Sequence, residues 1–80
     1  MNHPKLAHDL DDGAILGALT RQLRGGDFDV TVVGLAEETG IAPGRVVASL
    51  DRAYRDGTIR PHRTGIEVSG LLYFHTEVAP

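Results

Sequence analysis

The sequence predicts a small α+β fold, mainly helical, in which a three-helix core precedes a C-terminal β-hairpin. Apolar residues recur with helical spacing in three successive segments, and glycine or proline stands near the ends of these segments. Two short apolar runs separated by a glycine-containing stretch follow, which is the pattern of a hairpin. The length of 80 residues fits one domain. We assign residues 11–76 to it, 1–10 to an N-terminal segment and 77–80 to a tail.

The first helix is predicted from about Asp12 to Arg24. Its apolar face consists of Ile15, Leu16, Leu19 and Leu23. Either Asp11 or Asp12 is expected to cap its start by accepting hydrogen bonds from free backbone N–H groups. Gly25-Gly26 then ends the helix. The preceding residues, 4–10, fit a separate short helix.

The second helix is predicted over residues 32–39, with Thr31 as its N-cap and Gly40 at its end. The three residues before it, 28–30, suit a short bridging strand. A third helix is predicted from Pro43 to about Arg55, because proline fits the first helical position. Its expected buried stripe is Val46, Val47, Leu50 and Ala53. Its expected outward face carries Arg45, Ser49 and Arg52.

The hairpin is predicted from two strands, 58–62 and 71–75, with a loop over residues 63–70. Asp56-Gly57 turns the chain into the first strand, and Pro61 restricts that strand to a sheet edge. The second strand is apolar on both faces, whereas a half-exposed strand alternates. We therefore expect residues 1–10 or a partner to cover its outer face.

Residues 31–59 carry a further pattern, TVVGLAEETGIAPGRVVASLDRAYRDGTI. The pattern consists of Leu35-Ala36, Gly40-Ile41, Pro43-Gly44, Val46, Leu50 and Gly57 to Ile59. This string resembles the bacterial and archaeal winged helix-turn-helix transcription regulators. The resemblance implies a winged helix-turn-helix fold, with the hairpin as the wing. It also implies double-stranded DNA as the partner, with the third helix in the major groove.

The resemblance implies six DNA-contacting residues. They are Arg45, Ser49 and Arg52 on the third helix and Arg60, His62 and Arg63 on the hairpin. Arg45 would meet a base edge, since it lies in the first turn of the helix. The net charge of the chain is −3, but residues 41–65 hold five arginines against two aspartates. A local basic face matters more for phosphate binding than the total charge does.

A protein-interaction winged helix within a larger complex is the competing interpretation, because a fold does not fix a function. The acidic total charge and the apolar run Leu71–Phe74 favour it. A homodimer is also expected, formed by that run together with Leu6 and Leu10 of the N-terminal segment. Such an assembly would let two third helices meet neighbouring half-sites on DNA.

Enzymatic activity is not expected, because the sequence holds no phosphate-binding glycine loop, nucleophile elbow or zinc-binding helix motif. Asp27, Asp29, Glu37 and Glu38 fit turn and helix-surface positions. The two histidines of the hairpin, His62 and His75, make too few ligands for zinc. The chain has no cysteine, and we expect neither a cofactor nor a metal. No apolar run has the length of a signal peptide or membrane span, so a cytoplasmic location is expected.

Overall fold

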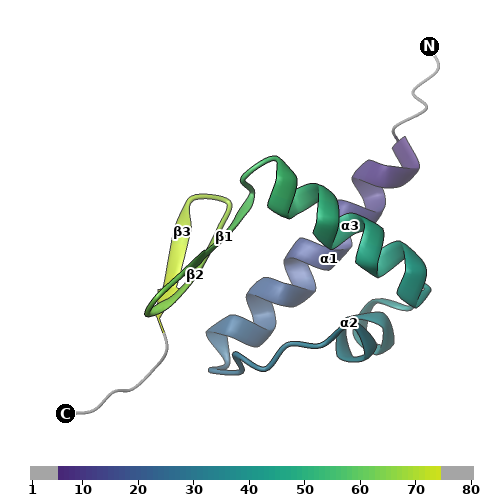
Figure 1. Cartoon of the computed structure of the whole chain (residues 1–80). Coiled ribbons are helices and arrows are strands. Elements are labelled where there is room, and N and C mark those ends of the chain that lie inside the picture. Colours follow the sequence, from purple (N-terminus) through teal and green to yellow (C-terminus); the bar gives the residue numbers. More distant parts are fainter. Residues whose placement is uncertain (1–5, 75–80) are drawn as a thin grey trace.

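Three helices followed by a three-stranded antiparallel sheet make up the computed structural model of the chain, which describes residues 6–74. The elements are α1 (Leu6–Arg24), α2 (Val32–Thr39), α3 (Pro43–Arg55), β1 (Ile59–His62), β2 (Gly65–Val68) and β3 (Leu71–Phe74). This arrangement confirms the predicted α+β fold, mainly helical, with a winged-helix layout (Figure 1). His75 and residues 77–80 lie outside the described residues.

Helix α1 is longer than predicted, because one continuous helix runs from Leu6 to Arg24. The separate helix expected over residues 4–10 is wrong over its described part. Asp11 and Asp12 are not caps either, since they lie inside the helix. No proline interrupts this stretch, and nothing else in it forces a break.

Helices α2 and α3 begin and end where the sequence predicts. The Oγ1 of Thr31 accepts a hydrogen bond of 3.0 Å from the Gly34 N–H and so caps α2. Gly40 ends this helix at φ 75°, a left-handed conformation that favours glycine. Pro43 opens α3 at its first turn.

The segment between α1 and α2 is not a strand, so the bridging strand expected over residues 28–30 is wrong. The sheet has the order β1-β2-β3 and does not include this segment. A local turn competes with pairing here, because the Asp29 N–H donates a 3.0 Å hydrogen bond to the Asp27 carboxylate. Phe28 and Val30 of this segment pack against the core.

The sheet has three strands instead of two, because β2 occupies residues 65–68, which were expected to form a loop. Val68 pairs with Leu71, so Ser69 and Gly70 alone connect β2 to β3. Both connecting residues have positive φ, 52° and 84°, as a type I′ hairpin turn requires. A serine-glycine pair between apolar residues was the sequence signal for this hairpin.

The core lies between the three helices and extends to the inner side of the sheet. Its buried apolar members are Ile15, Ala18, Leu19, Leu23, Leu35, Val46, Ala53, Ile59 and Val68. The predicted buried stripe of α3 is wrong at two positions, since Val47 is 52% exposed and Leu50 is only half-buried. Ser49, expected on the outward face, is buried instead.

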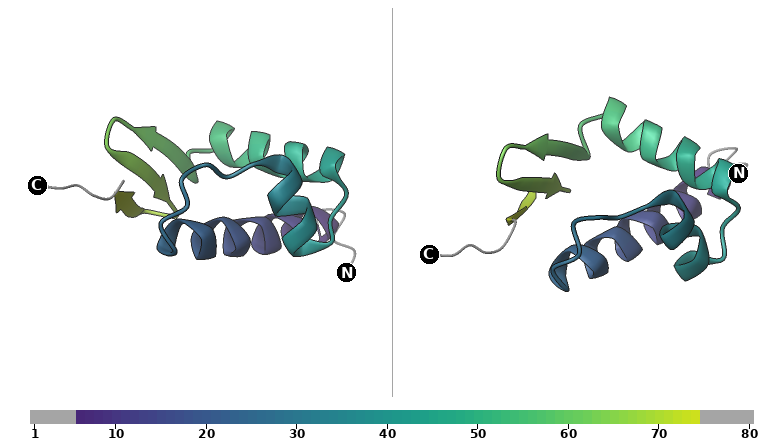
Figure 2. Two further views of the ribbon diagram at one scale, coloured as in Figure 1. Left: turned by 90° about the horizontal axis from the view of Figure 1, so that it is seen from below. Right: turned by 60° about the horizontal axis from the view of Figure 1, so that its bottom comes forward.

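The sheet and the beginning of α1 lie at opposite ends of the molecule (Figures 1 and 2). The sheet follows directly from the end of α3, and its described contacts with the helices run mainly through β1. Among residues 6–74, no helix is long and apolar enough to cross a membrane.

Candidate interaction surfaces

Arg45, the residue expected to read a base edge, is held by α1. Its Nη2 and Nε donate hydrogen bonds of 2.6 and 2.9 Å to the two carboxylate oxygens of Asp11. The Asp11 side chain is 9% exposed and that of Arg45 is 62% exposed. Arg45 is therefore exposed, as predicted for the outward face of α3, but its guanidinium is paired with a carboxylate of α1.

Ser49 and Arg52 share the neighbouring carboxylate of α1. The Ser49 hydroxyl donates a 2.5 Å hydrogen bond to Oδ1 of Asp12, and Arg52 Nη2 donates one of 2.7 Å to the same oxygen. Ser49 is 2% exposed, so its hydroxyl is inaccessible to a phosphate or a base. Of the three residues predicted on the outward face of α3, Ser49 is thus buried, whereas Arg45 and Arg52 stay partly exposed beside α1.

The pKa values of both aspartates respond to these bonds. The hydrogen bond from Arg45 lowers the pKa of Asp11 below its ordinary value. The hydrogen bonds from Arg52 and Ser49 lower the pKa of Asp12. Both carboxylates are consequently ionised at neutral pH, and each compensates the charge of one arginine.

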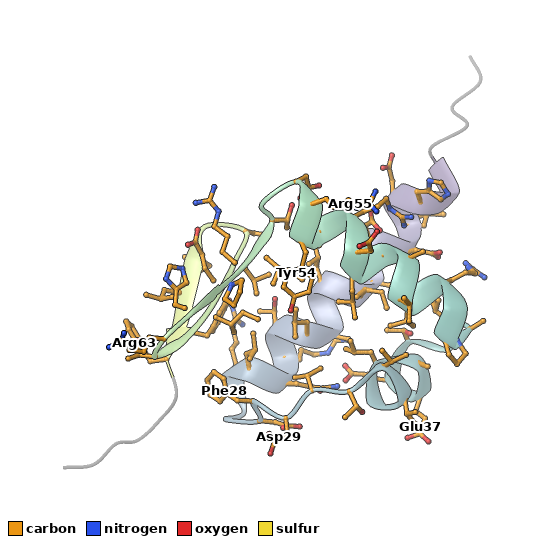
Figure 3. All side chains as sticks on the ribbon, viewed as in Figure 1. Phe28, Asp29, Glu37, Tyr54, Arg55 and Arg63 are labelled. Atoms are coloured by element: carbon orange, nitrogen blue, oxygen red, sulfur yellow. The ribbon has the colours of Figure 1, made fainter. Side chains whose placement is uncertain are left out.

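Some of the other charged side chains of α3 and the sheet pair with a neighbour on the same element or on the next strand. Arg55 Nε lies 3.1 Å from the Asp51 carboxylate one turn away, and His62 Nε2 lies 3.0 Å from the Glu67 carboxylate on β2. Within the described chain, Arg60 and Arg63 form no ion pair and are exposed. Figure 3 shows Arg63 at the hairpin tip, farthest from the helices.

The formal charges of the chain from α3 to the end of the sheet, together with the two carboxylates of α1 that contact α3, sum to zero. The five arginines are Arg45, Arg52, Arg55, Arg60 and Arg63. The five carboxylates are Asp11, Asp12, Asp51, Asp56 and Glu67. The sequence hides this balance, because the two carboxylates of α1 lie more than thirty residues away from the arginines that they contact. The five arginines, four of which are predicted to contact DNA, are therefore matched by an equal number of carboxylates.

An apolar surface on another side of α3 was missed by the sequence analysis. Val47 and Tyr54 are 52% and 51% exposed, and the half-buried Leu50 lies between them on the same side of the helix. In Figure 3, Tyr54 points from α3 toward α1. The available signal was an α3 sequence with more apolar side chains than one buried stripe accommodates.

A pocket of about 290 Å³ continues this apolar surface. It is lined by residues of all three helices, of the segment between α1 and α2, and of the sheet. Its walls include Leu23, Phe28, Val30, Leu50, Tyr54 and Ile66, and no charged residue lines it. We call this pocket, together with the exposed side chains of Val47 and Tyr54, the apolar groove. A mostly apolar concave site is the usual form of a binding pocket.

Two of the four carboxylates that could suggest catalysis, Glu38 and Asp27, accept hydrogen bonds within the protein. Glu38 accepts hydrogen bonds of 2.9 Å from Gln22 and 2.7 Å from Arg21, and these bonds lower its pKa. Asp27 accepts the turn bond described above. Over the residues that the structure describes, no group of three or more histidine or acidic side chains is arranged to hold a metal ion.

No protein-family model, curated protein or solved structure matches this chain. The surfaces described above are therefore the basis for assigning a function.

Proposed function

We propose that this chain is a protein-interaction module with a winged-helix layout, which binds an apolar segment of a partner protein in the apolar groove. The observation that carries the proposal is the exposure of Val47 and Tyr54 beside an uncharged pocket. Aromatic side chains are enriched at protein interfaces, and tyrosine combines a large apolar area with a polar end. Such a groove takes an aliphatic or aromatic anchor side chain from the partner.

The electrostatics support a protein partner over DNA. Duplex DNA presents a dense row of phosphates, and binding it needs a surplus of positive charge. Here the two arginines of α3 nearest to α1 are held by carboxylates of the same molecule. A phosphate would have to compete with an aspartate for each of them.

Photo-crosslinking tests the proposed groove. A benzophenone amino acid replaces Tyr54, whose ring it resembles, and the matched control replaces the exposed Glu37 of α2. Tyr54 borders the groove and Glu37 does not. In an extract of the source cells, we therefore expect a crosslinked partner from position 54 and none from position 37. The additional change Val47→Glu should abolish that product. Identical products from both positions would contradict the proposal.

Double-stranded DNA remains a second candidate, favoured by one observation. Arg60 and Arg63 are exposed without an ion pair in the described part of the chain, and Arg45 is 62% exposed in spite of its pairing. In this alternative, a transcription regulator would place α3 in the major groove after Arg45 releases Asp11. The hairpin arginines would contact the phosphate backbone.

Duplex titration at low and moderate salt tests the alternative. If DNA is the partner, Arg63→Ala should weaken binding to all sequences alike and reduce the salt slope by about one unit. Arg45→Ala should cost about 1–3 kcal/mol and relax the preference at one base pair. We expect no saturable binding, because the region carries no surplus of positive charge.

We also propose a cytoplasmic location, since a chain without cysteine forms no disulfide that an oxidising compartment would preserve.

A further inference from the structure

We propose that the free edge of β3 pairs with the same edge of a second copy of this chain, so that two sheets join into one antiparallel sheet of six strands. The sheet order β1-β2-β3 leaves one side of β3 without a neighbouring strand among residues 6–74. Alternate residues of an antiparallel strand direct their N–H and C=O groups toward each side. Those on the free side of β3 can therefore extend the ladder.

The two edges of the sheet differ in a way that selects β3. The edge strand β1 carries Pro61, which has no N–H to donate, and the charged Arg60. Proline and charge are the devices by which proteins protect an exposed edge from pairing. Strand β3 has the sequence Leu-Leu-Tyr-Phe and carries neither device.

The side chains of β3 are exposed on both faces of the sheet. Leu71, Leu72 and Phe74 are 59%, 41% and 60% exposed, and only Tyr73 packs against the core. A second copy of β3 would cover part of each exposed side chain. No formal charge lies on the strand, so two copies meet along it without repulsion.

A second copy is favoured as the occupant because the strand is complementary to itself. Two-fold symmetry about an axis perpendicular to the sheet places residues of the same face opposite each other. One such register sets Tyr73 opposite its own copy and Leu72 opposite Phe74 of the second copy. The neighbouring register sets Leu72 opposite its own copy. Both registers pair only apolar and aromatic side chains.

The structure changes the dimer that the sequence suggests. The sequence predicts a seam built from Leu71–Phe74 together with the N-terminal segment. The beginning of α1, which includes the 67% exposed Leu10, lies at the end of the molecule away from the sheet (Figures 1 and 2). Leu10 therefore does not belong to the β3 seam and serves as a matched control.

Single-cysteine crosslinking tests the pairing directly, because the natural chain has no cysteine. Opposed residues in an antiparallel ladder have Cα atoms about 4.5–5.5 Å apart, which a disulfide spans. Under mild oxidation, either Leu72→Cys or Tyr73→Cys should give a covalent dimer in high yield. Leu10→Cys should not. Equal, low yields from all three variants would overturn the proposal.

Sedimentation gives a second measurement that needs no disulfide. The unmodified protein should be dimeric at tens of micromolar. Leu72→Lys should be monomeric, because in one register the two lysines face each other and in the other each lysine is buried against an apolar side chain. Leu10→Lys should remain dimeric. A monomeric unmodified protein would contradict the inference. Circular dichroism on both variants shows that they are folded.

The inference stands apart from the proposed function, because β3 does not line the apolar groove. Tyr54→Glu should leave the dimer intact while it removes partner binding. Loss of the dimer in Leu72→Lys with unchanged crosslinking from position 54 shows two independent surfaces. A monomeric unmodified protein that still crosslinks from position 54 overturns the dimer alone.

Discussion

At the scale of single residues, Asp11 and Asp12 decide what α3 presents to its surroundings. A local pattern cannot reveal them, since an aspartate near the expected start of a helix fits a cap equally well. Their partners follow more than thirty residues later. Such a long-range pairing depends on how α1 and α3 pack, which no spacing within one helix encodes.

Acid should destabilise the protein through these two residues. Their folded pKa values lie below the ordinary value of 3.8, so their contribution to stability is complete above that pH. It is lost as the pH falls through the lower, folded values. Thermal unfolding between neutral pH and strongly acidic pH measures the loss. We expect Asp12→Asn to reduce this dependence, whereas an identical pH profile would contradict the pairing.

Ser49 should prove a structural residue rather than a ligand-binding one. It is buried, and its hydroxyl bonds the Asp12 carboxylate. Because the acceptor is charged, Ser49→Ala should lower the free energy of unfolding by about 1.5–3 kcal/mol. Chemical denaturation measures this loss. Thr64→Ala, which removes an exposed hydroxyl on the hairpin, serves as the control and should be close to neutral.

At the scale of elements, the sequence predicts what its caps and turns specify. Helices α2 and α3 begin and end at Thr31, Gly40 and Pro43 as expected, since these residues act within their own turn. The face of α3 is harder to predict. Its apolar residues exceed one stripe, and the buried Ser49 lies at a position that the pattern assigns to the outward face. Strand β2 was missed because a glutamate and a glycine interrupt its apolar pattern.

Two leucines facing the same core should differ in their contribution to stability. Leu35 of α2 is 1% exposed, whereas Leu50 of α3 is half-buried and lines the pocket. Leu35→Ala should therefore cost about 2–5 kcal/mol, as deletions in a packed core do. Leu50→Ala should cost clearly less, because its site is already open. Equal losses in thermal or chemical unfolding would show that the pocket is closed in solution.

At the scale of the whole molecule, the fold determines how charge is distributed around α3. The sequence alone suggests a basic second half, because residues 41–65 hold five arginines. The fold brings Asp11 and Asp12 of the acidic first half against two of them. The winged-helix layout could be predicted from the sequence, but the charge of its surface could not.

Removing the two carboxylates should raise the affinity of the chain for DNA. The double change Asp11→Asn and Asp12→Asn frees the charges of Arg45 and Arg52. Fluorescence anisotropy should then detect weak, sequence-independent duplex binding with a log–log salt slope of about −2, since each phosphate contact contributes about −0.9. The matched control, Asp27→Asn with Asp29→Asn, changes the net charge equally and should not bind.

Carboxylates of α1 hold Arg45 and Arg52 of α3, and this pairing underlies the choice of a protein partner over DNA. The most direct measurement is nuclear magnetic resonance of the Arg45 and Arg52 Nε–H groups, with duplex DNA added at low salt. Both groups bond aspartates in the structure, at 2.9 and 3.3 Å. Because the two aspartates hold these groups, we expect both signals to keep their positions throughout the titration. Saturable shifts of both signals at stoichiometric duplex would contradict this expectation.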